Sequence, residues 1–206
     1  MRMWPIGALI IAVSATAAVD QAKLRTPSQL NEQAPVAFNT RFDTSKGPFV
    51  IETHRDWSPR GADRFYNLVK NGFYDDCRFF RVIAGFLVEF GVHGNPDIQN
   101  AWTGAFFPDD PVRQSNKRGF VAFAKSTASH SRSTRIFINL QDNLSMDEGF
   151  SPFGRVTEGM DVVDMLHSGY AGEPQKQFTR MLAEGNAFLE RTFPKLDYIR
   201  TATIVR

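Results

Sequence analysis

The stretch RFFRVIAGFLVEFG, residues 78–91, places an arginine, Arg81, inside a hydrophobic run. Aromatic and β-branched residues flank Arg81 on both sides, a pattern typical of a strand with a buried face. Arginine is almost never fully buried without a partner, because an unpaired charge in an apolar interior is costly. The position of Arg81 therefore indicates a specific role for this side chain.

Short strands are predicted on both sides of this stretch. Apolar residues alternate with polar ones over 35–42, and a second strand is predicted over 49–53. The turn-forming residues 43–47 between them predict a hairpin over 35–54. Further along the chain, strands are predicted at 120–124, 136–140, 153–156 and 198–205.

Helices are fewer than strands in the predicted order. One begins at Ser58-Pro59, where serine caps free amides and proline suits the first helical position, and ends at Asn71-Gly72. Others are predicted over 158–166 and over 177–192, although Gly185 weakens the second. Residues 91–118 and 125–135 are predicted to be loops. Many short strands with few helices favour a mostly β fold, a barrel or a sandwich.

The amino terminus has the pattern of a secretory signal peptide. Residues 1–18 contain Arg2, an apolar stretch over 6–13 and small residues at 15–18. A membrane anchor is the alternative, but the apolar stretch is short for a bilayer. We expect a signal peptide at 1–18, a linker at 19–34, one domain at 35–206, and a secreted protein or one of the secretory-pathway lumen or periplasm.

Composition narrows the function classes. The 206 residues carry 24 Lys and Arg against 22 Asp and Glu, which gives no case for nucleic acid, or for a membrane after signal cleavage, as the partner. Cys77 is the only cysteine, so an internal disulfide is excluded, and a buried inert thiol is favoured over a reactive one. The four histidines lack metal-ligand spacing, and we expect neither metal nor cofactor.

Four segments together identify a family that the chain resembles. They are GFYDDCRFFRVIAGFLVEFG, RGFVAFAKS, STRIFINLQDN and SPFGRVTEGMDVVDML, spread over roughly residues 36–167. In this order they resemble the cyclophilin-type peptidyl-prolyl isomerases. The resemblance implies a closed eight-stranded antiparallel barrel capped by two helices, to which residues 170–192 add a C-terminal helical extension.

The resemblance also implies a catalytic role for Arg81, which would contact the substrate proline. Rotation about an X–Pro bond has a barrier of ~18–20 kcal/mol. In the twisted transition state amide resonance is lost, so the prolyl nitrogen accepts a hydrogen bond better than it does in either planar form. A guanidinium aimed at that nitrogen would therefore bind the transition state preferentially, without metal, nucleophile or proton transfer.

Further substrate-binding residues follow from the same resemblance. The proline ring would sit among apolar side chains, each of which has ordinary core packing as the alternative reading. By position these are Phe86, Leu87, Phe137 and Met146. Ala124 matches another residue of the groove, and Phe150 stands where the family has a histidine. Ser145 stands at the position of the family's tryptophan, which predicts weak cyclosporin binding.

Charged residues replace three polar groups of the family's groove. Glu89 and Arg135 each stand in place of a glutamine, and Lys125 in place of an asparagine. Glu89 and Arg135 are predicted to form an ion pair, to be independent solvated substitutions, or to leave Glu89 paired with Arg81. Arg81, Lys125 and Arg135 make the groove basic, offset only by Glu89, and predict a preference for acidic residues beside proline.

The sequence thus supports two functions. The first is peptidyl-prolyl isomerisation that assists folding of exported proteins, by a monomer acting on proline-containing peptides and unfolded proteins, with turnover reduced by the substitutions as an open alternative. The second is a proline-peptide binding module with negligible turnover. The sequon Asn143-Leu144-Ser145 predicts a glycan beside the groove only in a eukaryotic secretory pathway.

Overall fold

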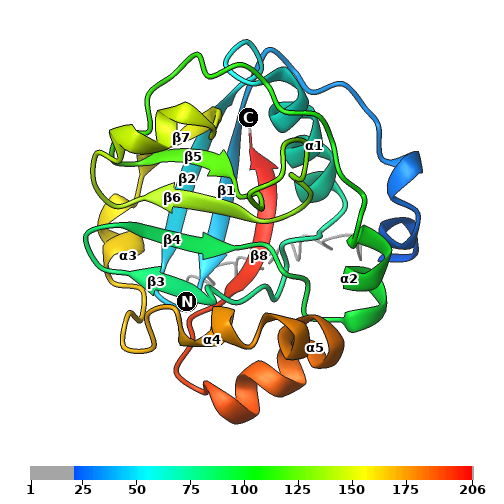
Figure 1. The fold of residues 1–206 in the computed structure, drawn as a ribbon, viewed down its shortest axis with the longest axis vertical. Helices are drawn as coiled ribbons and strands as arrows, with labels where there is room; N and C mark the ends of the chain where they lie inside the picture. The colour runs from blue at the N-terminus through cyan, green and yellow to red at the C-terminus, as the bar shows by residue number, and fades with distance from the viewer. Residues whose placement is uncertain (1–20, 206) are drawn as a thin grey trace, which may run out of the picture.

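Eight antiparallel strands form one curled sheet in the computed structural model, which describes residues 21–205 (Figure 1). The strand order is β3-β4-β6-β5-β7-β2-β1-β8. The predicted signal peptide, residues 1–18, lies outside the described residues. The strands are β1 (Ala37–Thr44), β2 (Pro48–His54), β3 (Arg81–Ile83), β4 (Leu87–Phe90), β5 (Phe120–Phe123), β6 (Ile136–Asn139), β7 (Pro152–Glu158) and β8 (Ile199–Val205).

Helices cover the sheet at its ends and along one edge. None of the helices within residues 21–205 is long and apolar enough to cross a membrane. The helices are α1 (Pro59–Lys70), α2 (Pro96–Trp102), α3 (Met160–Asp164), α4 (Glu173–Lys176) and α5 (Phe178–Thr192), with short 3-10 turns η1 (Gln21–Arg25), η2 (Pro27–Gln29) and η3 (Leu144–Glu148).

The sheet is open, so the expectation of a closed barrel was wrong. Strands β3 and β8 stand at opposite ends of the strand order. The segment before β3 meets the start of β8 instead: Arg78 and Tyr198 form an isolated bridge, and the backbone N–H of Ile199 donates to the carbonyl of Cys77 at 3.0 Å. Beyond that bridge the backbone N–H of Val82 in β3 donates to the carbonyl of Ala171 at 3.3 Å. The C-terminal extension thus occupies the edge of β3 that β8 would need to close the barrel.

The core between the sheet and α1 is rich in aromatic rings. Phe42 and Phe49 stack with ring centroids 4.9 Å apart, and Phe65 of α1 lies 4.8 Å from Phe153 of β7. The buried residues of α1 include Ala62, Phe65, Leu68 and Val69, which recur at helical spacing. Cys77 is fully buried as well, and burial raises the pKa of its thiol well above the ordinary value, as an inert thiol requires.

The start of α1 is capped differently from the prediction. The Ser58 hydroxyl does not cap the helix but donates to the carboxylate of Asp110 at 2.6 Å. Asp110 in turn accepts from the backbone N–H groups of Arg60 (3.2 Å) and Gly61 (3.0 Å). A carboxylate 50 residues downstream therefore satisfies the free amides of the helix.

Two segments predicted to lack structure are ordered by side-chain contacts. In the predicted linker, Leu24 is fully buried and its carbonyl accepts the indole N–H of Trp102 at 2.8 Å. The predicted loop 91–118 contains α2, whose first residue is Pro96 and whose N-cap, Asn95, accepts from the amide of Asp97 at 2.9 Å. The Asn95-Pro96 pair was a start signal that the sequence reading missed.

The predicted C-terminal helical extension is present as α4 and α5. Residues of α5 pack with Phe80 and Val92 in a second hydrophobic core that also includes Met181, Phe188, Leu189, Phe193 and Leu196. Figure 1 shows α4 and α5 along the edge of the sheet next to β3. The helix predicted over 158–166 is shorter, since α3 spans only Met160–Asp164.

Candidate active site

The apolar residues predicted for the proline ring come together on the outer face of the sheet. We call this group the apolar cluster: its buried members are Leu87, Ala122, Ala124 and Phe137, and its half-buried members are Phe86, Met146 and Phe150. All the predicted apolar site residues belong to it. Ala122 is an addition that sequence reasoning missed, although it lies two residues before Ala124 in the same extended segment.

Strand register explains why these side chains share a face. In β4 and β6, Glu89 lies directly opposite Phe137, and in β5 and β6, Ala122 lies opposite the same Phe137. Residues opposite each other in an antiparallel pair point to the same side of the sheet, as do residues two apart in one strand. Leu87, two residues before Glu89, joins them by the same rule.

Glu89 joins two arginines on this face. Its Oε2 accepts from Nη1 of Arg81 at 3.1 Å, and its Oε1 accepts from Nη1 of Arg135 at 2.8 Å. The Glu89 side chain is 3% exposed, whereas each arginine side chain is 23% exposed. Two of the three hypotheses for these residues therefore hold together, and the one with independent solvated substitutions was wrong. We call Arg81, Glu89 and Arg135 the charged triad.

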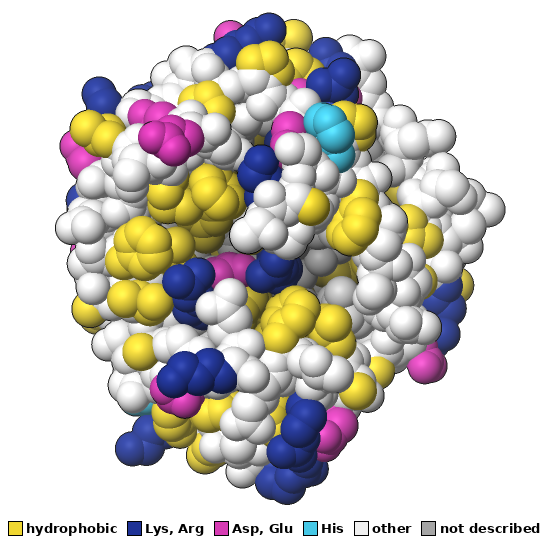
Figure 2. Space-filling view, viewed as in Figure 1, with side chains coloured by type: hydrophobic (Ala, Val, Ile, Leu, Met, Phe, Trp, Pro, Cys, Tyr) yellow, Lys and Arg dark blue, Asp and Glu magenta, His cyan; other side chains and the backbone are white. Residues whose placement is uncertain are grey.

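The triad leaves Arg81 at the surface beside the apolar cluster. Arg81 lies opposite Glu89 in the β3–β4 pair, which brings the two charges together across neighbouring strands. Its guanidinium carbon is 5.7 Å from the ring centroid of Phe86. In Figure 2 an acidic side chain lies between basic ones near the centre of this face, next to hydrophobic side chains. Glu89 thus supplies the partner that a partly buried guanidinium needs.

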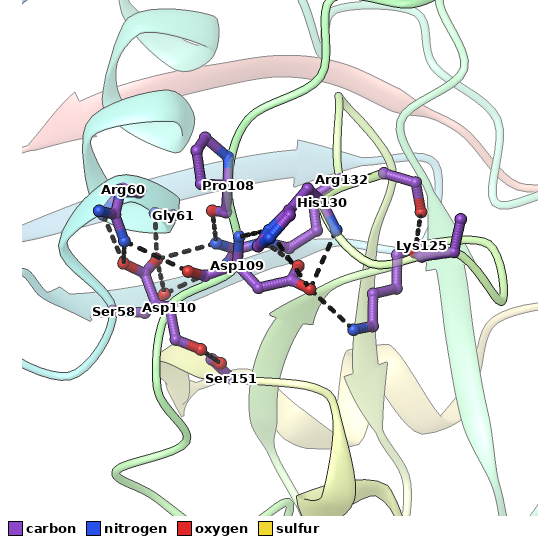
Figure 3. A network of polar contacts seen from close by, with 12 residues as sticks. Ser58, Arg60, Gly61, Pro108, Asp109, Asp110, Lys125, His130, Arg132 and Ser151 are labelled. Atoms are coloured by element: carbon purple, nitrogen blue, oxygen red, sulfur yellow. Dashed lines mark hydrogen bonds and ion pairs between the residues drawn. The ribbon is translucent and has the colours of Figure 1, made fainter.

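Lys125 belongs to a separate polar network (Figure 3). Its ammonium donates to Asp109 Oδ2 at 3.0 Å and lies 5.8 Å from the ring centroid of Phe150. Asp109 also accepts from the backbone N–H of His130 at 3.1 Å and pairs with Arg132 at 3.2 Å. Glu89 is therefore not the only offset to the basic groove, because Asp109 neutralises Lys125.

The same network fixes the loop that follows Lys125. Arg132 is 2% exposed and pairs with Asp110 at 3.1 Å, so it links the loop to the start of α1. Burial acts to raise the pKa of Asp109, but the bonds from the His130 amide and from Lys125 outweigh it and lower the pKa. Asp109 is therefore an anion at neutral pH. No sequence signal indicated that Asp109 and Asp110 would meet Lys125 and Arg132.

This face can bind an apolar group and polarise a hydrogen-bond acceptor that lies next to it. Within the part of the chain that the structure describes, no group of three or more histidine, cysteine or acidic residues is arranged to hold a metal ion. The face carries a partly exposed guanidinium that is held by a buried carboxylate. Next to it lies the apolar cluster, whose buried members come from β4, β5 and β6 and from the residue that follows β5.

A model of the family described as "Cyclophilin type peptidyl-prolyl cis-trans isomerase/CLD" matches residues 39–183. Peptidyl-prolyl cis-trans isomerase cyp18 of Streptomyces antibioticus is 35% identical over 136 residues, which cover 61% of this chain and 80% of that protein. Peptidyl-prolyl cis-trans isomerase B of Escherichia coli K12 is 29% identical over 172 residues, covering 77% and 93%.

Solved structures share the fold. A cyclophilin type peptidyl-prolyl cis-trans isomerase of Cryptosporidium parvum superposes with a TM-score of 0.63 at 16% identity, over 82% of this chain and 98% of that one. The same protein crystallised in the presence of the dipeptide Ala-Pro superposes with a TM-score of 0.61 at 16% identity, over 82% and 99%.

Proposed function

This chain belongs to the cyclophilin-type peptidyl-prolyl cis-trans isomerases, and on that premise we propose that Arg81 and the apolar cluster together catalyse rotation about X–Pro bonds. The proline ring packs on the half-buried rings of Phe86 and Phe150. The Arg81 guanidinium then donates to the prolyl nitrogen as the bond twists. The observation that carries this assignment is the exposed part of Arg81 beside the cluster, with its charge held in place by Glu89.

The size of the Arg81 contribution can be bounded. A hydrogen bond to a charged group is worth ~1.5–3 kcal/mol, and each ~1.36 kcal/mol changes a rate tenfold. The hydrogen bond from Arg81 therefore increases the rate of isomerisation by about ten- to a hundredfold. Packing of the proline ring and restraint of one side of the bond supply the rest. The planar guanidinium presents its N–H donors in a fixed arrangement, which suits this role.

The substrates we propose are proline-containing segments of unfolded exported proteins, whose folding the enzyme assists. The signal-peptide pattern at residues 1–18 supports this location. A secreted protein, or one of the secretory-pathway lumen or periplasm, meets chains that fold after translocation. Slow X–Pro isomerisation, which takes tens to hundreds of seconds uncatalysed, delays the folding of such chains.

One observation favours a second function, a proline-peptide binding module. Glu89 takes up one N–H group of Arg81 at 3.1 Å, and a carboxylate competes for that cation more strongly than a neutral amide does. If this contact keeps Arg81 from the prolyl nitrogen, peptides bind on the apolar cluster without turnover.

An isomerisation assay on a proline tetrapeptide separates the two functions. We expect Arg81→Ala to lose about ten- to a hundredfold in kcat/KM while peptide binding falls much less. Arg191→Ala removes an exposed arginine of α5, far in sequence from the triad, and serves as the charge-matched control with unchanged rate. Wild-type protein that binds the peptide yet leaves its isomerisation at the uncatalysed rate would establish the binding module instead.

A further inference from the structure

A cavity of about 200 Å³ opens next to the charged triad. We call it the side cavity. It shares Ala124 with the apolar cluster and Arg135 with the triad, so it adjoins the proposed proline site. The other walls come from α2, from the segment that follows it and from α5, and the loop before β6 adds the polar residues Ser126, Ser131, Ser133 and Thr134. The lining includes Trp102, Phe106, Ala124, Arg135, Phe178 and Leu182.

Arg135 gives the side cavity its charge. Of the described residues that line the cavity, Arg135 is the only charged one. Glu89 is its only acidic partner in the described chain, and Glu89 is shared with Arg81. Two guanidinium groups and one carboxylate leave a net charge of +1 on the triad. Lys125 differs, because Asp109 neutralises it at 3.0 Å.

The C-terminal extension orients this cation. The guanidinium carbon of Arg135 lies 5.0 Å from the ring centroid of Phe178, at the start of α5. Glu89 holds one end of the guanidinium and the ring of Phe178 lies against it, so both fix its orientation toward the cavity. Leu182, one turn further along α5, adds to the apolar wall. Apolar walls strengthen the attraction of a charge for an anion, because they exclude water from around it.

The distance between Arg81 and Arg135 suits a substrate residue that is close to the proline in the peptide. The carboxylate of Glu89 accepts from both Arg81 and Arg135, so only this carboxylate separates the two guanidinium groups. An extended peptide advances ~3.3–3.6 Å per residue. A peptide whose prolyl nitrogen meets Arg81 therefore brings the side chain of a residue within about two positions to Arg135.

We propose that Arg135, positioned by Glu89 and by Phe178 of the extension, is a specificity-determining residue that selects an acidic side chain close to the X–Pro bond. The acidic group pairs with Arg135 at the mouth of the side cavity, and its aliphatic stem packs against Phe178 and Leu182. This inference rests on the proposed isomerase function, which it deepens by naming the substrate class.

Matched peptides test the proposal. Tetrapeptides that contain one X–Pro bond carry Glu or the isosteric Gln at each position within two residues of proline. We expect wild-type protein to favour the Glu peptide of at least one position by about fivefold in kcat/KM, the ratio that ~1 kcal/mol gives for a partly exposed ion pair. The preference should fall as salt is raised, since ions screen exposed charges.

Variants assign the preference to Arg135. Arg135→Gln should bring the Glu-to-Gln ratio to about one, and so should the double variant Glu89→Gln/Arg135→Gln, which leaves no buried carboxylate with a missing partner. Phe178→Ala should lower the ratio in part. Arg191→Gln removes the same charge from α5 outside the cavity and should keep the full ratio.

The outcomes separate this inference from the proposed function. Wild-type protein that turns over Glu and Gln peptides equally, or a double variant that keeps the preference, overturns the role of Arg135 and leaves the isomerase intact. Wild-type protein without turnover on any of the peptides contradicts the proposed function instead. In that case the Glu-to-Gln ratio of dissociation constants still tests selection by Arg135.

Discussion

At the scale of single residues, Glu89 accounts for two unusual charges. A buried carboxylate must be paired, because removing one partner leaves an uncompensated charge in an apolar surrounding. Glu89 is 3% exposed and bonds Arg81 and Arg135, each 23% exposed. Glu89 without Arg135 would keep only Arg81 as its partner, whereas Arg135 without Glu89 would leave two neighbouring guanidinium groups with no carboxylate between them. Arg135 at this position therefore depends on Glu89.

The first prediction concerns this coupling. Glu89→Gln and Arg135→Gln should each lower the free energy of unfolding: the first leaves two neighbouring guanidinium groups without their carboxylate, and the second removes one of the two ion pairs of a buried carboxylate. The double variant should lose less than the sum of the two, by about 1–3 kcal/mol. Urea denaturation of the four proteins forms the double-mutant cycle. Additive losses would show that the carboxylate does not couple Arg135 to the fold.

At the scale of elements, the C-terminal extension is bent where it meets α2. Gly185 in the middle of α5 has φ 59° and ψ −143°, outside helical values. A Cβ at Gly185 would lie 2.1 Å from the carbonyl oxygen of Gly94, and that same carbonyl accepts the backbone N–H of Asn186 at 3.0 Å. The bend lets α5 approach the chain just before α2 and places its first turn, with Phe178, at the side cavity.

The second prediction follows from this close approach. Gly185→Ala should destabilise the protein by ~2 kcal/mol or more, because the positive φ alone costs ~1–3 kcal/mol for a residue with a side chain and the methyl group also meets the Gly94 carbonyl. Gly172→Ala is the control: it has φ −101°, and no atom lies within 4 Å of the place that its methyl group would take. Thermal unfolding distinguishes them, and equal melting temperatures would contradict the tight contact.

At the scale of the whole molecule, burial of polar groups sets how stability responds to pH. His93 lies between the sheet and α2, 4% exposed. Its Nδ1 accepts the backbone N–H of Asn95 at 2.9 Å, and its ring lies 5.1 Å from that of Phe73. Burial lowers the pKa of His93 to about 4, although the charge of Asp76 opposes the shift. The folded protein therefore holds this imidazole neutral.

The third prediction is a loss of stability in mild acid. An unfolded histidine binds a proton near its ordinary pKa of 6.5, whereas folded His93 binds one only near pH 4. Stability is therefore fully present above pH 6.5 and falls as the pH is lowered toward 4, by up to about 3 kcal/mol. Urea denaturation at pH 7, 6 and 5 measures the slope.

A matched variant isolates His93 in that experiment. His93→Asn keeps an acceptor for the Asn95 amide but does not titrate, so it should flatten the dependence between pH 6.5 and 5. Carboxylates titrate mainly below this window and are common to both proteins. Equal slopes for the wild type and His93→Asn would show that another group is responsible.

The sequence by itself determined α1, α5 and the strands other than β4 (Leu87–Phe90). Alternating apolar residues fix which face of a strand is buried, and Ser58-Pro59 and Asn71-Gly72 mark the ends of α1 through local backbone preferences. These signals act between residues close in the chain, so they can be read without the fold. The motifs around Arg81 added the residues of the site by resemblance.

Only the tertiary structure decided which charges meet and where the sheet ends. Glu89 reaches Arg135 across 46 residues of chain, and Asp110 caps α1 from 50 residues away. Periodicity carries no information on such pairs, because they depend on how strands register and which loops cross. The same is true of Ala171, which occupies the edge of β3 and leaves the barrel open, and of Phe178, which brings the extension to Arg135. Long-range packing, not local preference, built the side cavity.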